Sequence, residues 1–97
     1  MNLVVEAQAQ AELNDARDYY LEHASANIAR AFLEQFERAV NLLRMHPALG
    51  TPVSARLRKL PLRRFPYWLI YRLHGETLSI LAVAHQRRRP GYWSRWR

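Results

Sequence analysis

The chain has no cysteine and only three glycines among its 97 residues. The missing thiols exclude disulfides, a cysteine nucleophile and thiolate metal ligands, and the scarcity of glycine leaves no Gly-rich loop to cradle a phosphate. No apolar run approaches the roughly 18 residues of a membrane span. No basic residue precedes Arg17, which argues against a signal peptide. We expect a cytoplasmic protein that binds no membrane, metal or cofactor.

The acidic residues are scarce in the second half of the chain. Residues 1–49 carry a net charge of −3 and residues 50–97 a net charge of +10, so the total of +7 belongs to the second half. The length predicts one domain over residues 1–97. A chain of this size buries only roughly 65% of the surface that its unfolded form exposes, so its stability is marginal.

Apolar residues in the first half recur at helical spacing and predict two antiparallel helices. The first is expected over about residues 7–22, with one face formed by Ala9, Leu13, Ala16 and Tyr20. Ser25 is the expected N-cap of the second helix, which ends before Pro47 because a residue that precedes proline avoids the helical conformation. The second apolar face consists of Ala29, Phe32, Leu33, Phe36, Val40 and Leu43.

After Pro52 the apolar pattern alternates, which predicts strands. A turn at residues 74–76 would join two strands into a hairpin. Residues 53–63 would add a third strand with Pro61 at a bulge or an edge, and residues 2–6 would join the sheet to satisfy their amides. The expected common faces of the hairpin are Phe65, Tyr67, Leu69, Tyr71 and Leu73 on one strand, and Leu78, Ile80, Ala82 and Ala84 on the other. The expected fold class is α+β in the order β-α-α-β-β-β, with a helical hairpin packed on a small, mainly antiparallel sheet.

The segment 86–97 interleaves arginines with aromatic rings. Such a surface suits contacts to phosphate or carboxylate groups together with stacking, so we expect it to bind the target. A solvated tail with its rings packed on the sheet is the alternative. The basic side chains of residues 56–64 either extend this surface or protect an edge strand. The expected target-binding residues are Arg87, Arg88, Arg89, Tyr92, Trp93, Arg95 and Trp96.

The four histidines match no metal-ligand spacing. His85 differs from the others because it ends an apolar strand beside Arg87 and Arg88, whose charge favours a neutral imidazole and therefore a general base. A purely structural role for this residue is the alternative. No Ser/His/Asp set is evident.

Three segments together resemble the RelE/ParE superfamily of type II toxins: His46–Gly50, Arg64–Tyr71 and Leu81–Trp93. The resemblance covers nearly the whole chain. It implies a plasmid- or chromosome-encoded toxin that is bound and neutralised by a cognate antitoxin. This partner would be acidic, DNA-binding and encoded by the adjacent gene, and the two proteins would form a hetero-oligomer.

The superfamily divides by target: RelE-like members cut mRNA on the ribosome without a metal, and ParE-like members inhibit DNA gyrase and are not nucleases. Lys59, Arg88 and Tyr92 match the nuclease pattern, but Pro61 and Trp68 stand where it has basic residues, which weakens stabilisation of a phosphorane. The resemblance therefore favours a ParE-like gyrase inhibitor that is not an enzyme. One alternative is a non-toxic, basic nucleic-acid-binding module. The other is an mRNA interferase whose catalytic residues would be Lys59, Arg64, His85, Arg88 and Tyr92.

The two expected helices also carry apolar residues outside their main stripes. A partner segment that covered them would stabilise a marginal domain. An acidic partner would also be attracted to the basic second half of the chain. The expected antitoxin-binding residues are Tyr19, Leu21, Ile28, Leu42, Arg56 and Arg58.

Overall fold

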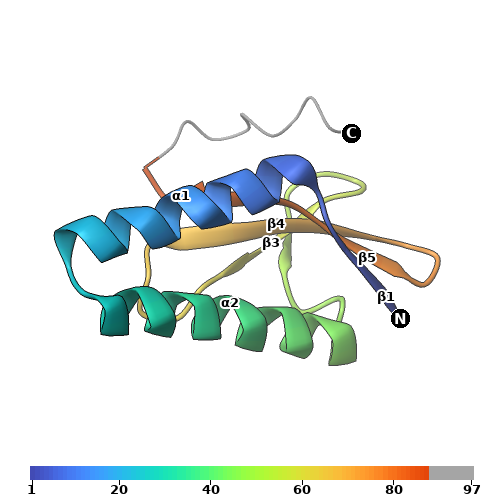
Figure 1. Cartoon of the computed structure of the whole chain (residues 1–97). Coiled ribbons are helices and arrows are strands. Elements are labelled where there is room, and N and C mark those ends of the chain that lie inside the picture. Colours follow the sequence, from blue (N-terminus) through green and yellow to red (C-terminus); the bar gives the residue numbers. More distant parts are fainter. Residues whose placement is uncertain (88–97) are drawn as a thin grey trace.

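The computed structural model describes residues 1–87, which form two helices and a five-stranded sheet (Figure 1). In chain order the elements are β1 (Asn2–Val5), α1 (Ala7–His23), α2 (Ala26–Met45), β2 (Thr51–Pro52), β3 (Arg58–Pro61), β4 (Tyr67–His74) and β5 (Thr77–His85). This arrangement confirms the expected α+β class and order of elements, with the short strand β2 as an addition.

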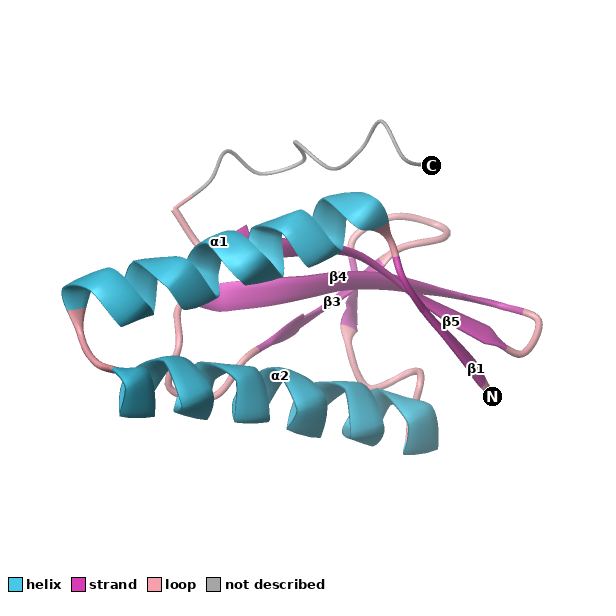
Figure 2. Ribbon diagram, viewed as in Figure 1, coloured by secondary structure: helices cyan, strands magenta, loops and turns pink. Residues whose placement is uncertain are grey.

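The strands lie in the order β1-β5-β4-β3-β2. The first strand pairs in parallel with β5, and the remaining neighbours pair antiparallel (Figure 2). The pairing of Asn2–Val5 with residues 77–80 confirms that the first strand joins the sheet. A two-residue turn between β4 and β5 has Gly75 at φ +59°, a conformation that glycine adopts without steric cost.

Both helices form where the apolar spacing predicts them. The Ser25 hydroxyl oxygen accepts a hydrogen bond from the Ile28 N–H at 3.1 Å, which confirms Ser25 as the N-cap of α2. The rings of Tyr20, Phe32 and Phe65 pack together between the helices and the sheet. The buried helical residues are Ala9, Leu13 and Ala16 of α1 and Ala29, Phe32, Phe36, Ala39, Val40 and Leu43 of α2.

The expected strand over residues 53–63 is wrong in its first half. The Ser54 hydroxyl oxygen accepts the N–H of Leu57 at 3.2 Å, and the Leu57 carbonyl accepts the N–H of Val53 at 2.9 Å. These local bonds hold a loop in place of a strand. Pro61 ends β3 opposite Trp68, beyond the short β2, which confirms its place at an edge.

A bulge changes which side chains of β5 face the helices. It lies at Leu81, because Ile70 pairs with Ala82 while Tyr71 pairs with Ile80. One extra residue shifts the alternation by one, so the expected common face of this strand is wrong beyond the bulge. The residues under the helices are Leu78, Ile80 and Val83, and those in the cluster on the opposite face are Leu81, Ala82 and Ala84.

Candidate interaction surfaces

Lys59 lies on the face of the sheet that the helices leave uncovered. It pairs with Ile70, which belongs to the apolar cluster of that face. Its ammonium nitrogen lies 4.3 Å from the centroid of the Trp68 ring, within the range of a cation–π interaction. Trp68, which stands where the nuclease pattern has a basic residue, therefore packs against Lys59, the one lysine of the chain.

His85 lies on the other face, beside α1. Its ring packs edge-on against Tyr67 at a centroid distance of 5.0 Å. Its Nδ1 accepts a hydrogen bond from the Arg87 N–H at 3.1 Å, which places the proton of the neutral ring on Nε2. His85 also lines a cavity of about 380 Å³ together with Glu12 and Tyr20.

Tyr20 and Tyr67, which both line this cavity, remain protonated near neutral pH. Burial, together with the neighbouring Tyr20, raises the pKa of Tyr67 to about 12, and burial raises the pKa of Tyr20 as well. Neither hydroxyl is therefore a base at physiological pH.

Glu12 has a structural role in the same cavity. One of its carboxylate oxygens accepts the backbone N–H of Val83 at 2.9 Å. Val83 lies beyond Ile80, the last residue of β5 that pairs with β1.

Three of the five proposed interferase residues, Lys59, Arg64 and His85, lie in the described part of the chain, and the structure does not bring them together. Lys59 and His85 lie on opposite faces of the sheet. Arg64 sits in the loop before β4 at φ +72°, exposed, with its guanidinium carbon 5.6 Å from the Phe65 ring centroid. Arg88 and Tyr92 lie outside the described residues. The catalytic set therefore stays a prediction.

The expected target-binding surface lies almost entirely beyond the described part of the chain. Arg87 is described and exposed. The others, which lie outside residues 1–87, are Arg88, Arg89, Tyr92, Trp93, Arg95 and Trp96.

The expected antitoxin-binding residues do not form one surface. Tyr19 and Leu21 of α1 are 56% and 49% exposed, whereas Ile28 packs against the core. Arg56 is exposed in the loop before β3, and Arg58 is half-buried, with its Nη1 donating hydrogen bonds to backbone carbonyls of the α2–β2 connection.

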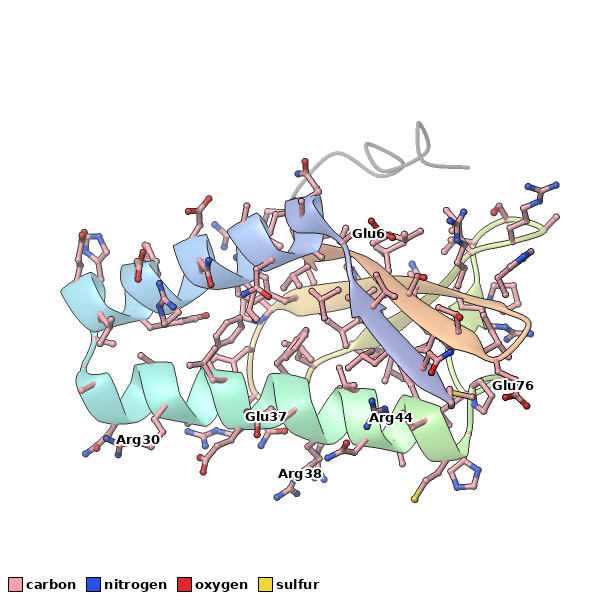
Figure 3. All side chains as sticks on the ribbon, turned by 45° about the vertical axis from the view of Figure 1, so that its right-hand side comes forward. Glu6, Arg30, Glu37, Arg38, Arg44 and Glu76 are labelled. Atoms are coloured by element: carbon pink, nitrogen blue, oxygen red, sulfur yellow. The ribbon has the colours of Figure 1, made fainter. Side chains whose placement is uncertain are left out.

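Leu42 lines a groove of about 740 Å³ between α2 and β3. Its apolar lining includes Met45, which is 69% exposed, together with Leu60 and Pro61. Sequence reasoning missed Met45, although it stands three residues after Leu42 and therefore on the same side of α2. Charged residues of both signs border the groove, and Figure 3 shows two of them, Glu37 and Arg38, on α2; the others are Glu34 and Arg63.

The described residues offer no metal site and no membrane span. Within residues 1–87 no three His, Asp or Glu side chains come close enough to hold a metal ion. Neither helix of this part of the chain is both long and apolar enough to cross a bilayer.

The fold and these surfaces define a small α+β protein with a helical layer on one face of its sheet and a partly apolar groove between α2 and β3. A family model for the ParE toxin of the type II toxin–antitoxin system parDE matches residues 3–90. The chain belongs to this family, which confirms the expected resemblance and its ParE-like branch.

One solved structure, described as the chromosomal ParDE TA system from P. aeruginosa, shares the fold with a TM-score of 0.77 at 23% sequence identity. The match covers 88% of this chain and 95% of the other chain. None of the curated proteins compared with the sequence matches it.

Proposed function

We propose that this ParE-family toxin inhibits DNA gyrase by binding it, without cutting nucleic acid, and that a cognate antitoxin neutralises it. The observation that carries the proposal is the family match over residues 3–90. The positions of Lys59 and His85 on opposite faces of the sheet support it, because general acid–base catalysis needs both groups within reach of one substrate.

The helical layer supports a protein partner. Leu42 and Met45 are 39% and 69% exposed in one groove, and Tyr19 and Leu21 are exposed on α1. Apolar side chains that gather in a groove with a polar rim are typical of protein interfaces. An antitoxin segment that filled the groove between α2 and β3 would bury this surface and stabilise the toxin by mass action.

Expression of the toxin alone tests the target. We expect growth arrest with induction of the SOS response and intact mRNA, together with inhibition of supercoiling by purified gyrase. Primer extension on mRNA is the complementary measurement. Codon-phased cuts that disappear in Arg88→Ala and Tyr92→Ala would overturn the gyrase proposal in favour of an interferase.

Co-expression of the adjacent gene tests neutralisation. We expect growth to recover and the two proteins to purify together. Unchanged toxicity in the presence of every neighbouring gene would contradict the antitoxin part of the proposal. Absence of toxicity with and without these genes would favour the non-toxic nucleic-acid-binding alternative.

A further inference from the structure

A cavity of about 880 Å³ lies beside the C-terminal end of α2, apart from the groove that contains Leu42. The connection from α2 to β2, the loop before β3 and the end of β4 enclose it. Its ionisable side chains are Arg56, Arg58, Arg72 and His74, and no acidic side chain of the described chain lines it. We refer to this cavity as the basic pocket.

Neutral groups hold Arg58 in the wall of the basic pocket. Its Nη1 donates hydrogen bonds to the carbonyl oxygens of Gly50 at 2.7 Å and Ala48 at 3.1 Å. The Tyr71 hydroxyl fixes the same connection by accepting the Gly50 N–H at 2.8 Å. These contacts orient the guanidinium group, and within residues 1–87 no acidic side chain forms an ion pair with it.

Arg72 carries a buried donor that lacks an acceptor. Its Nε is buried and has no hydrogen-bond partner within the described structure. Glu6 and Gln8 line a smaller hollow of about 330 Å³ that Arg72 also borders, yet no hydrogen bond or ion pair joins either of them to Arg72. Buried polar groups are nearly always paired, so this donor indicates a missing acceptor.

The lining of the basic pocket decides which anion fits. Pro47, Pro52 and Leu73 line the same pocket as the cations, and Leu73 is 44% exposed. Surfaces that bind single-stranded nucleic acid combine cations with several aromatic rings for stacking, whereas His74 is the one aromatic ring among the described residues that line this pocket. Carboxylates with apolar neighbours match its mixture of charge and apolar surface.

We propose that the basic pocket binds the carboxylate side chains of an acidic peptide segment whose neighbouring residues are apolar. Arginine side chains bind carboxylates through paired N–H donors, and Arg56, Arg58 and Arg72 all line this one pocket. The identification of this segment as part of the antitoxin rests on the proposed function, whereas carboxylate binding by the pocket does not.

The test is a titration of the full chain with a synthetic peptide of alternating leucine and glutamate, followed by ¹⁵N–¹H NMR of the arginine Nε–H groups. We expect a saturable shift of the Arg72 signal. The variants Arg72→Gln and Arg56→Gln should each weaken binding about tenfold. Arg30→Gln removes the same charge at the opposite end of α2 (Figure 3) and should have no effect. Arg56 is an exposed loop residue, so its variant reports on binding even if Arg72→Gln fails to fold.

A control peptide of alternating leucine and glutamine has the same apolar residues without the carboxylates. An Arg72 signal that does not shift with the glutamate peptide, or that shifts equally with the glutamine peptide, would overturn the proposal. A stronger response to a single-stranded oligonucleotide would also overturn it and assign the pocket to nucleic acid. If the full chain does not bind the peptide but the adjacent gene still neutralises its toxicity, the pocket proposal fails and the proposed function stands. The variant Arg56→Gln could bind the peptide more weakly and yet be neutralised by the adjacent gene as well as the wild type. That result would show that the antitoxin does not occupy the basic pocket.

Discussion

The ammonium group of Lys59 lies 4.3 Å from the centroid of the Trp68 ring, on the face of the sheet opposite the helices. A cation in this position is attracted to the face of the indole, which contributes about 0.5–1 kcal/mol at an exposed site. The contact gives Lys59 a structural role that does not depend on the cleavage of RNA.

The variant Lys59→Met keeps most of the aliphatic chain and removes the charge. We expect the free energy of unfolding to fall by about 0.5–1 kcal/mol, while growth inhibition stays at the wild-type level. Urea denaturation and a growth assay on inducing plates measure the two effects. Lys59→Arg, which keeps a cation over the ring, is the control. Loss of toxicity in a folded Lys59→Met variant would support the interferase alternative.

The groove between α2 and β3 should determine neutralisation. We expect the double variant Leu42→Gln and Met45→Gln to bind the antitoxin about tenfold more weakly or worse, since exposed apolar anchors dominate such interfaces. Leu49→Gln is the matched control, because Leu49 is 48% exposed but lies outside the groove. Growth assays with the adjacent gene co-expressed should show toxicity returning only in the double variant. Equal neutralisation of all three proteins would place the antitoxin elsewhere.

The toxin–antitoxin complex should weaken as salt concentration rises. The second half of the chain carries +10, and the Debye length shortens from roughly 10 Å at 0.1 M salt to about 3 Å at 1 M, which screens attraction to an acidic partner. Titration calorimetry of the complex across this range measures the effect. A dissociation constant that does not change with salt would contradict the electrostatic contribution.

Tyr71 joins the sheet to the chain reversal after α2. Its hydroxyl donates a hydrogen bond to the Pro47 carbonyl at 2.7 Å and accepts the Gly50 N–H at 2.8 Å. Tyr71→Phe leaves both backbone groups without this partner, so we expect a loss of about 1–3 kcal/mol of folding free energy. Urea denaturation measures it. Tyr19→Phe, at a residue 56% exposed, should change stability by no more than about 0.5 kcal/mol.

Stability should fall at alkaline pH through Tyr67. Burial, with the adjacent Tyr20, raises its pKa from 10.0 to about 12. Between these two values the unfolded chain has lost a proton that the folded chain keeps, so stability decreases as pH rises. The contribution is complete below pH 10 and lost as the pH passes about 12. Urea midpoints between pH 8 and pH 11.5 should fall less steeply in Tyr67→Phe; identical slopes would contradict the shift.

The helices, the cap at Ser25 and the turn at Gly75 could all be predicted from the sequence. Each depends on residues that are close along the chain. The helices follow from an apolar repeat, and the cap from a hydroxyl that accepts the N–H three residues later. The turn follows from a glycine between two segments of alternating apolar residues. The first half of the strand expected over residues 53–63 was wrong because Ser54 offers local hydrogen bonds that compete with the sheet, whereas β3 forms in the second half.

The sequence by itself determined the α+β class, the separation of charge and the ParE-like resemblance, since periodicity, composition and short motifs are local properties. Only the tertiary structure decided that Lys59 and His85 lie on opposite faces and that Arg72 meets Arg56 and Arg58 in one pocket. The physical reason is the register between strands. A single extra residue at Leu81 exchanges the faces of β5, and that register is set by pairing partners far apart in the chain.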